Sequence, residues 1–509
     1  MKLLERILKI AQESPDKVVF SEAERSYTYR ELIGMMSLIA DKIKQKRYEN
    51  EKEKLRPILI FGKNDFITLT SMLAANMTGH AYIPVDAHTP FERTEMIWSA
   101  SKVTTIITTA ELSEEFKKLF ADRISVSADS IEQLSVSKKF PKINLDDAIS
   151  GDDSAYIIYT SGTTGIPKGV EVSHDNLASF TNWMNHDFLQ IENNQILSQA
   201  LYSFDLSIFS IYPSLTTGGN LVSLSRKETT NFKLLFERLN STVINTWIST
   251  PSFVDICLLD SSFVEKNHPH LQQFIFCGEE LTVKTAEKLL TAFPSASIFN
   301  TYGPTEATGA ISSVQITQEL LKNHTRLPIG YAKPDVEVRI IDGEIIIIGD
   351  SVAKGYYENP EKTAQSFFSI KGKKAYHTGD AGSVSTDGML YYQGRIDFQV
   401  KFNGFRIELQ DIEANMQEIE QIEKAIVLPK FNTQHKVTAL VAFVKTNQNL
   451  FQPTDKSAMR AFTKQLKAEL SKTIMDYMMP TQFIYLEELP LNQNGKVDRK
   501  ALALKMAGE

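Results

Sequence analysis

From the N-terminus to about Leu327, segments with apolar residues at helical spacing alternate with short β-rich runs. Helical spacing of apolar residues predicts helices at residues 29–43, 65–78 and 112–120. Short β-rich runs predict strands at residues 57–61, 81–85, 104–108, 155–159, 221–224, 246–249, 273–276 and 297–299. Strands that alternate with helices are typical of crossover connections around a largely parallel sheet. The pattern therefore predicts an α/β fold with layered subdomains for this part of the chain.

The pattern changes after Leu327. Strands predicted at 336–341 and 344–348 flank Asp342-Gly343, which is a strong hairpin signal. Beyond a strand at 389–393, the order becomes helix 409–423, strand 425–428, strand 438–444, helix 456–473 and an extended end. We therefore place a boundary near Asp397, between a large domain, 1–396, and a small, mobile α+β domain, 397–509.

Composition narrows the class of protein. The chain has 509 residues, of which 42% are hydrophobic, 10% aromatic and 23% charged, so a disordered chain, a collagen and a coiled coil are excluded. The net charge is −7, from 55 Lys and Arg against 62 Asp and Glu, which argues against a nucleic-acid partner. The two cysteines, Cys257 and Cys277, cannot build a disulfide framework or a CxxC zinc site.

The N-terminus mixes charged and apolar residues at helical spacing, which predicts an amphipathic helix over residues 1–12 rather than a signal peptide. No run approaches the roughly 20 apolar residues that are needed to cross a bilayer. We therefore expect a cytoplasmic protein without membrane insertion.

One loop has the composition of a phosphate-binding site. Residues 159–170, YTSGTTGIPKGV, place three glycines, one serine, three threonines and a lysine between two predicted strands. Glycines let the backbone approach a ligand, and consecutive N–H groups together with hydroxyls and Lys168 suit a polyphosphate. A flexible surface loop is the alternative, since such clusters are common in loops. A P-loop is disfavoured, because Gly169 and not Ser or Thr follows Lys168.

This loop resembles the signature of the AMP-forming adenylating enzymes. Further motifs of that family follow the same order along nearly the whole chain: AYIPVDAHTP at 81–90, NTYGPTE at 300–306, TGD at 378–380, GRID at 394–397 and NGKVDR at 494–499. The resemblance implies the adenylate-forming fold, with a large domain that binds ATP and an amino acid.

The resemblance also implies roles for individual residues. Lys496, Lys168 and Thr160 would be catalytic, Glu306 would bind Mg²⁺ and Asp397 would be the hinge. The ATP-binding set would be Thr160, Ser161, Gly162, Thr163, Thr164, Gly165, Lys168, Asn300, Thr301, Tyr302, Thr305, Asp380, Arg395 and Lys496. Taken singly, these residues have ordinary alternatives, such as a turn for Asp380 or an acid near a helix N-terminus for Glu306.

The substrate-binding set would be Asp205, Leu206, Cys277 and Gly303. Asp205 lies in the apolar run SFDLSIF, where we expect a buried carboxylate that is costly unless it is paired. A helix N-cap is one way to pair it. In family members that activate amino acids, the matching residue binds the ammonium group of the substrate. Cys277 would lie against the substrate and favour the D configuration, whereas Cys257 is predicted to be a core residue.

Residues 274–280, 250–253 and 203–207 resemble the members that activate D-alanine as D-alanyl-AMP. Such members pass the D-alanyl group to the phosphopantetheine thiol of a D-alanyl carrier protein, for teichoic acids of the cell wall. No carrier domain follows Arg499, so we expect a stand-alone ligase. Gly309 departs from the pattern, because a bulkier aliphatic residue is expected there, and could enlarge the pocket. The alternatives are activation of glycine or another small amino acid, and a catalytically silent binding protein.

Overall fold

The computed structural model describes residues 2–49, 55–120, 124–127, 143–162, 165–433, 436–447, 456–491 and 497–507. These residues form two compact units. The first comprises Met1–Ala87, Trp98–Tyr159 and Gly169–Ile396, and the second comprises His88–Ile97, Thr160–Lys168 and Asp397–Glu509. The second unit thus takes its main segment from Asp397 onward and adds two short segments from earlier in the chain.

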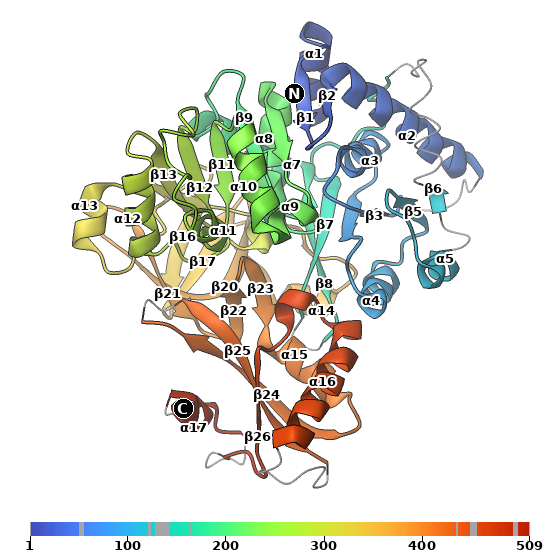
Figure 1. Ribbon diagram of the computed structural model, residues 1–509. Helices are drawn as coiled ribbons and strands as arrows, with labels where there is room; N and C mark the ends of the chain where they lie inside the picture. Colours follow the sequence, from blue (N-terminus) through green and yellow to red (C-terminus); the bar gives the residue numbers. More distant parts are fainter. Residues whose placement is uncertain are drawn as a thin grey trace. The chain divides into compact units, whose positions relative to one another are not determined.

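A largely parallel sheet of nine described strands crosses the first unit (Figure 1). Its order is β15 (Tyr331–Ala332), β14 (Ser312–Gln315), β13 (Ser297–Tyr302), β12 (Gln273–Phe276), β11 (Thr246–Ser249), β9 (Gln195–Ser198), β10 (Asn220–Ser223), β1 (Val18–Ser21) and β2 (Ser26–Thr28). Every neighbouring pair from β13 to β1 is parallel, and the two ends of the sheet add antiparallel strands. The predicted parallel α/β architecture is confirmed.

A second sheet in the described chain has seven strands. Its order is β18 (Gly355–Tyr356), β8 (Lys168–Ser173), β7 (Ser154–Thr160), β4 (Tyr82–Asp86), β3 (Ile58–Gly62), β5 (Thr105–Thr108) and β6 (Ile124–Val126). The phosphate-loop motif connects β7 to β8, so the chain enters and leaves it through strands of this sheet.

Alternating side chains of the nine-stranded sheet point into two different cores. In β11, Ile248 joins the core with helices α1 (Leu3–Glu13), α2 (Tyr29–Glu49), α3 (Phe66–Met77), α7 (His174–Asp187) and α8 (Ile208–Thr217). Its neighbour Trp247 joins the core with α10 (Phe232–Ser241), α11 (Pro251–Cys257) and α12 (Val283–Ala292). Cys257 is fully buried there, as predicted. Helices on both faces explain why β11 is buried along its whole length.

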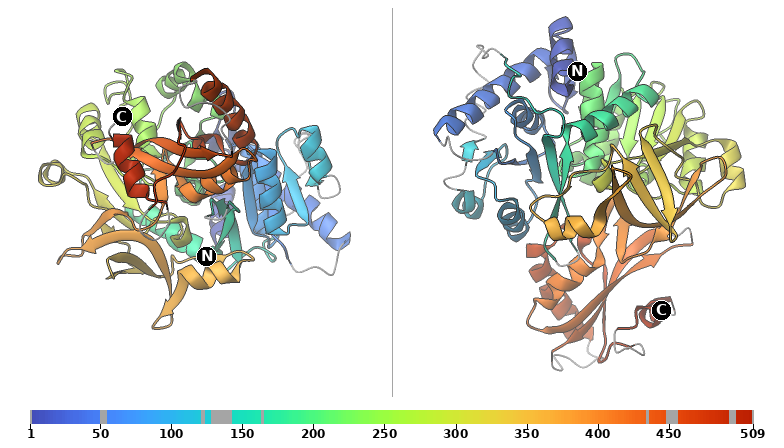
Figure 2. Two further views of the ribbon diagram at one scale, coloured as in Figure 1. Left: turned by 90° about the horizontal axis from the view of Figure 1, so that it is seen from below. Right: turned by 180° about the vertical axis from the view of Figure 1, so that it is seen from behind.

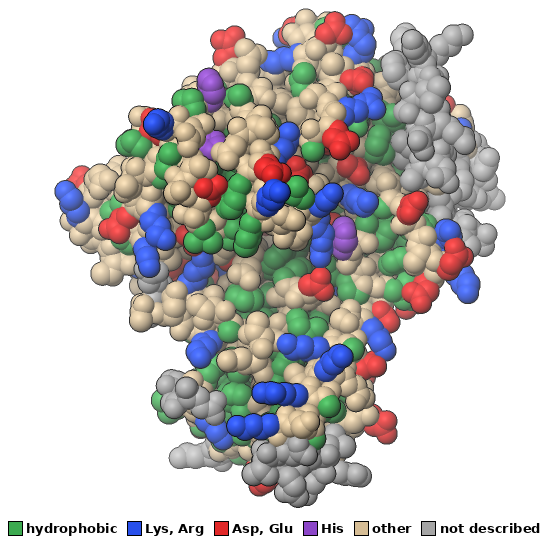
Figure 3. Space-filling view, in the orientation of Figure 1, with side chains coloured by type: hydrophobic (Ala, Val, Ile, Leu, Met, Phe, Trp, Pro, Cys, Tyr) green, Lys and Arg blue, Asp and Glu red, His purple; other side chains and the backbone are tan. Residues whose placement is uncertain are grey.

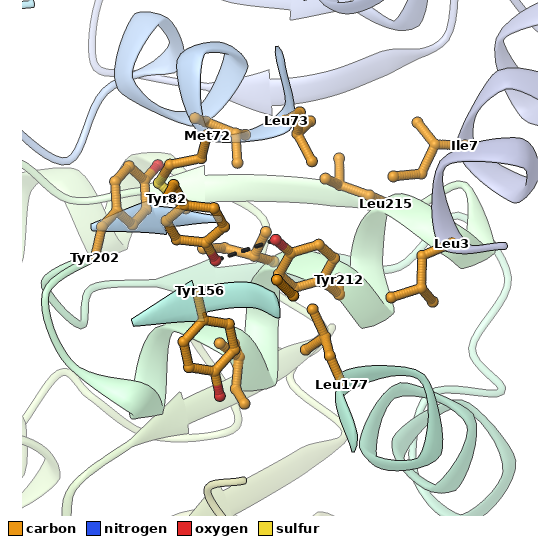
Figure 4. Packing of buried hydrophobic residues seen from close by; sticks show 14 of the residues in the cluster. Leu3, Ile7, Met72, Leu73, Tyr82, Tyr156, Leu177, Tyr202, Tyr212 and Leu215 are labelled. Atoms are coloured by element: carbon orange, nitrogen blue, oxygen red, sulfur yellow. Dashed lines mark hydrogen bonds between the residues drawn. The ribbon is translucent and has the colours of Figure 1, made fainter. Parts of the chain in front are cut away.

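The first of these cores also includes residues of the seven-stranded sheet. Figure 4 shows Tyr82 of β4 and Tyr212 of α8 pointing toward each other, with their hydroxyls 3.1 Å apart. Both rings are almost fully buried, so this hydrogen bond satisfies polar atoms that would otherwise be costly there. The other described α-helices of the first unit are α5 (Glu114–Phe120), α9 (Arg226–Thr230), α13 (Gln318–Asn323) and α14 (Pro360–Ser366), and α4 (Phe91–Ser101) falls partly in each unit.

A smaller antiparallel sheet completes the first unit. It contains β16 (Val336–Ile341), β17 (Glu344–Gly349), β20 (Lys373–Val384), β19 (Phe367–Ile370) and β21 (Leu390–Arg395). Asp342 and Gly343 join β16 to β17 with φ values of +51° and +82°, as a two-residue hairpin turn requires. The predicted hairpin is confirmed.

The second unit is built on a three-stranded sheet with helices on both faces. Its strands are β24 (Ile422–Phe431), β25 (Val437–Thr446) and β26 (Gln482–Tyr485). Alternate residues of β24 and β25 pack against α15 (Leu409–Gln417) and α16 (Lys456–Thr473), and the others pack against α17 (Arg499–Ala507). Figures 1 and 2 show α16 and α17 on opposite sides of these strands. A hairpin of β22 (Gln399–Phe402) and β23 (Phe405–Glu408) precedes α15.

Two local predictions in this unit are wrong. The helix predicted over 409–423 ends at Gln417, because Ile422 already pairs with Thr446 at the start of the β24–β25 ladder. The end predicted as extended contains the helix α17. Its start is stabilised by the Asp498 carboxylate, which accepts hydrogen bonds from the backbone N–H groups of Lys500 and Ala501.

Neither sign of charge dominates the face of the larger unit that is visible in Figure 3. Figure 3 shows lysine, arginine, aspartate and glutamate side chains interspersed over the visible face of the larger unit. In the parts of the chain that the structure describes, no helix is long and apolar enough to cross a membrane.

Asp65 gives the first unit a pH-dependent stability. Burial, with a smaller contribution from Glu22, raises the pKa of its carboxyl from 3.8 to about 6. The unfolded chain therefore ionises Asp65 at lower pH than the folded chain does, and stability falls as pH rises from about 4 to about 6. In Asp65→Asn this loss is absent, while asparagine still caps α3 by accepting from the Thr68 N–H, as Asp65 does. We therefore expect the difference in free energy of unfolding between the variant and the wild type to shift in favour of the variant by about 1–3 kcal/mol from pH 4.5 to pH 7.5.

Denaturant midpoints of both proteins at the two pH values check this expectation. An identical pH dependence in the variant and the wild type would contradict the assignment to Asp65.

Candidate functional site

Most of the predicted site residues of the first unit gather where its parallel strands end. Cys277 follows β12 directly, residues 300–302 end β13, and Thr305 and Glu306 follow in η2 (Thr305–Ala307). Asp205 lies in η1 (Asp205–Ser207), between β9 and α8. Since parallel strands end at one edge of a sheet, residues from separate segments meet there, and this edge is where α/β folds bind ligands.

Asp205 is held by a side chain from this edge. The Thr305 hydroxyl donates a 2.6 Å hydrogen bond to Asp205 Oδ2. The expected burial is only partly right, because Asp205 is half-buried, like Phe204 before it, although Leu206 after it is buried. The N-cap interpretation is wrong, since Phe204 occupies the cap position of η1 and Asp205 is already its first residue. The carboxylate is therefore held by a residue that lies 100 positions later in the chain.

Cys277 and Gly309 approach each other at the same edge. Cys277 is buried, and its Sγ lies 3.7 Å from the carbonyl oxygen of Gly309. Gly309 has φ +82°, and a Cβ there would lie 2.9 Å from Cε2 of Phe209. The space beside Gly309 is thus taken up by an aromatic ring, so the missing side chain does not leave the enlarged pocket that the sequence suggested. The space at Gly303 is equally limited, because a Cβ on it would lie 2.6 Å from Cα of Ala310.

Gly309→Ala is expected to destabilise the first unit by about 2–4 kcal/mol, from left-handed backbone strain and overlap with Phe209. Gly343→Ala is the matched control, because Gly343 has the same φ of +82° with nothing within 4 Å of a Cβ. The control should cost only the strain, about 1 kcal/mol. Thermal or denaturant unfolding of the two variants measures the difference, and equal losses would exclude the overlap with Phe209.

A second cluster surrounds Asp380. Its carboxylate accepts hydrogen bonds from the Tyr302 hydroxyl at 2.5 Å and from Arg395 Nη1 at 2.9 Å. Arg395 also donates to the Thr378 carbonyl, and the Thr378 hydroxyl accepts from the Asp380 N–H. Burial and the nearby Asp380 raise the pKa of Tyr302 well above its usual range, so this phenol stays protonated and donates. Asp380 itself is almost fully buried, with its carboxylate in a defined orientation.

Glu306 is completely buried, and its Oε1 accepts a 2.9 Å hydrogen bond from the Tyr356 hydroxyl. The sequence did not point to Tyr356, which comes 50 residues later in a two-residue strand and outside any motif. The predicted residues Asn300 and Thr301 donate to the carbonyls of Pro328 and Phe276, at 2.8 Å each.

The predicted loop residues fall in the second unit. The Ser161 hydroxyl contacts the backbone of β23, donating to the Arg406 carbonyl and accepting from the Glu408 N–H. The Gly165 N–H donates to the Gly162 carbonyl. The Thr160 hydroxyl donates to the carbonyl of Lys168, and the Lys168 side chain is half-buried. Asp397 accepts from the Gln399 N–H at the start of the main segment. Thr163, Thr164 and Lys496 lie outside the described residues.

Comparison with known proteins identifies the family to which the chain belongs. The model of the AMP-binding enzyme family matches residues 8–357, and that of the AMP-binding enzyme C-terminal domain matches residues 411–496. The chain is 70% identical, over all of both chains, to the D-alanine--D-alanyl carrier protein ligase of Lactococcus lactis subsp. lactis. It is 42% identical to the ligase of the same name from Lacticaseibacillus paracasei, over 97% of each chain.

Among solved structures, the Vibrio cholerae adenylation domain AlmE in complex with glycyl-adenosine-5'-phosphate matches all of this chain and 98% of its own. The TM-score is 0.80 at 22% sequence identity, which supports the fold. With one family model covering most of the chain and another covering its C-terminal part, this protein belongs to the AMP-binding enzyme family and has the adenylate-forming fold, with a large α/β domain and a small C-terminal domain.

Proposed function

We propose that this chain activates D-alanine with ATP and transfers it to the phosphopantetheine thiol of a D-alanyl carrier protein. The relative that is 70% identical over its full length has the name of such a ligase, and membership of the family implies the use of ATP. The structural observation that favours an amino acid substrate is the Asp205 carboxylate, held by Thr305 at the strand edge where Cys277 also lies. A fixed anion is the group that an α-ammonium requires.

In the first step, the carboxylate of D-alanine attacks the α-phosphorus of ATP. A carboxyl O–P bond forms and the bond to the bridging oxygen of the β-phosphate breaks, which yields D-alanyl-AMP and pyrophosphate. Asp205 holds the ammonium, Cys277 and Gly303 border the substrate, and the preorganised Asp380 carboxylate accepts from the ribose hydroxyls. Positioning and charge neutralisation, including that by Lys168 and Lys496, supply most of the rate enhancement.

A Mg²⁺ ion fits this scheme through Glu306. Mg²⁺ binds through one or two carboxylates together with substrate phosphates and waters, so it needs no cage of protein ligands. Among the described residues, no group of three or more His, Cys, Asp or Glu is placed to hold a metal ion. Glu306 offers a buried carboxylate whose Oε1 is oriented by Tyr356. Glu306 would hold the ion, which would supply charge neutralisation for the phosphates.

In the second step, the thiolate of the carrier attacks the carbonyl carbon of D-alanyl-AMP. A C–S bond forms, the C–O bond to AMP breaks, and the thiol proton goes to solvent. We infer that Asp397 is the hinge about which the small domain moves between the steps, withdrawing Lys496. The hairpin turn of residues 401–406 then lines the entry of the phosphopantetheine arm. The D-alanyl thioester serves the D-alanylation of teichoic acids, and the use of ATP implies a cytoplasmic reaction.

Pyrophosphate exchange into ATP with D-alanine, L-alanine, glycine and D-serine tests the substrate. D-Alanine should give the highest kcat/KM, and equal or better exchange with L-alanine or glycine would transfer the assignment to another small amino acid. No exchange with any of them would indicate a silent binding protein. Appearance of a D-alanyl thioester on a phosphopantetheinylated carrier protein tests the second step.

A further inference from the structure

An arginine–glutamate pair lies behind the Asp380 cluster. Arg326 donates to Glu280 through two nitrogens, Nε to Oε1 at 2.9 Å and Nη2 to Oε2 at 2.6 Å. Glu280 lies in the loop after β12, and Arg326 lies between α13 and β15. Both side chains are half-buried, with 32% exposed for Arg326 and 24% for Glu280. Two parallel hydrogen bonds hold the guanidinium plane in one orientation, which a single contact does not.

The held guanidinium covers an aromatic ring. Arg326 Cζ lies 4.9 Å from the ring centroid of Tyr392, on β21. The Tyr392 ring lies in turn 6.2 Å from the ring of Tyr302, whose hydroxyl donates to Asp380. A continuous set of contacts therefore runs from Glu280 through Arg326 and the two tyrosines to the Asp380 carboxylate.

The segment around Arg326 is fixed on both sides. Leu390, at the start of β21, exchanges backbone hydrogen bonds with Ile329 and Gly330. The carbonyl of Pro328, two residues after Arg326, accepts from the Asn300 side chain. Arg326 is thus anchored to the same backbone that contacts Asn300, another residue of the nucleotide set.

We propose that Arg326, held by Glu280, is a positioning residue for the nucleotide: it fixes the Tyr392 and Tyr302 rings and so orients Asp380 toward the ribose. This inference rests on the proposed function of Asp380 as the ribose-binding carboxylate. A hydrogen-bonding group at an active site must be held to within about 0.5 Å of its productive position, and packed neighbours provide that restraint. Arg326 acts through other side chains and does not touch the reacting atoms.

The test compares Arg326→Ala, Glu280→Gln and Arg326→Lys with the wild type in pyrophosphate exchange. KM for ATP should rise about 5–20-fold in all three, while KM for D-alanine stays within about twofold. The preference for ATP over 2′-deoxy-ATP and 3′-deoxy-ATP should fall by about fivefold or more, because Asp380 is no longer positioned to accept hydrogen bonds from the ribose hydroxyls. Lysine should not restore it, since an ammonium has neither the two-pronged geometry nor the planar stacking of arginine.

Arg25→Ala is the matched control. Arg25 also pairs with a glutamate, Glu31 at 3.2 Å, and covers a tyrosine, Tyr27 at 4.4 Å, but next to β2 at the opposite edge of the nine-stranded sheet. The Arg25→Ala variant should prefer ATP over the two deoxy nucleotides as strongly as the wild type does. If the wild type discriminates against the deoxy nucleotides and the Arg326 and Glu280 variants do so equally, the positioning role is overturned and the proposed function stands. If the wild type itself does not discriminate, the ribose role of Asp380 is overturned, and this inference with it.

Discussion

Asp205→Asn is expected to lower kcat/KM for D-alanine by about 100-fold or more, with KM for ATP unchanged. Asparagine keeps the shape of the side chain and an oxygen that accepts from Thr305, but it removes the charge that pairs with the substrate ammonium. Removing one partner of a desolvated ion pair costs about 3–5 kcal/mol, and partial exposure of Asp205 puts the effect toward the lower end. Steady-state pyrophosphate exchange against D-alanine and against ATP measures the two constants separately.

Asp255→Asn is the control for this prediction. Asp255 also accepts from a threonine hydroxyl, that of Thr285 at 2.8 Å, but it lies on α11, which packs in the core on the other face of the nine-stranded sheet. Its exchange kinetics should stay within about twofold of the wild type. An equal loss in both variants would show that the Asp205 change acts through stability rather than through the substrate.

Lys496→Ala is expected to reduce adenylate formation by about 10²–10³-fold and to leave thioester formation nearly intact. Loss of one preorganised charge at a transition state typically has this size of effect. A lysine that acts only in the first step has no part in thiol attack. The first step is measured by pyrophosphate exchange, and the second by single-turnover transfer from preformed D-alanyl-AMP to the carrier protein.

Lys500→Ala is the control here, since Lys500 is an exposed lysine four residues later, in α17. It should retain both half-reactions. A loss of both half-reactions in Lys496→Ala would contradict a role confined to adenylation.

The sequence predicted the parallel architecture well, because short runs with aromatic and β-branched residues, such as β11 and β12, alternate with segments of helical spacing. It also predicted the β16–β17 hairpin, since Asp342-Gly343 suits the left-handed turn. The sequence prediction failed where contacts between residues far apart in the chain determine the secondary structure. The ladder that starts at Ile422 shortens α15, and α17 depends on a cap by Asp498 and on burial of Leu502 against β24 and β25.

In the candidate site too, local motifs were predicted from the sequence, whereas contacts between distant residues were not. Motifs pointed to Asp205, Asp380 and Glu306, and also to Tyr302 and Thr305, but not to which hydroxyl orients which carboxylate, and they missed Tyr356. The Tyr356 contact to Glu306 joins residues 50 positions apart, and the Thr305 contact to Asp205 joins residues 100 apart. A periodic pattern has no information on such pairs. The effect of Gly309 was likewise invisible, because it depends on where the Phe209 ring lies.

The most direct test of the amino acid site compares D-alanine with D-lactate, which has a hydroxyl in place of the ammonium, in the wild type and in Asp205→Asn. If Asp205 binds the ammonium, the wild type should prefer D-alanine by about 100-fold or more in kcat/KM. In the variant that preference should fall to near unity. The same preference in both proteins would contradict the assignment of Asp205 as the group that recognises the substrate.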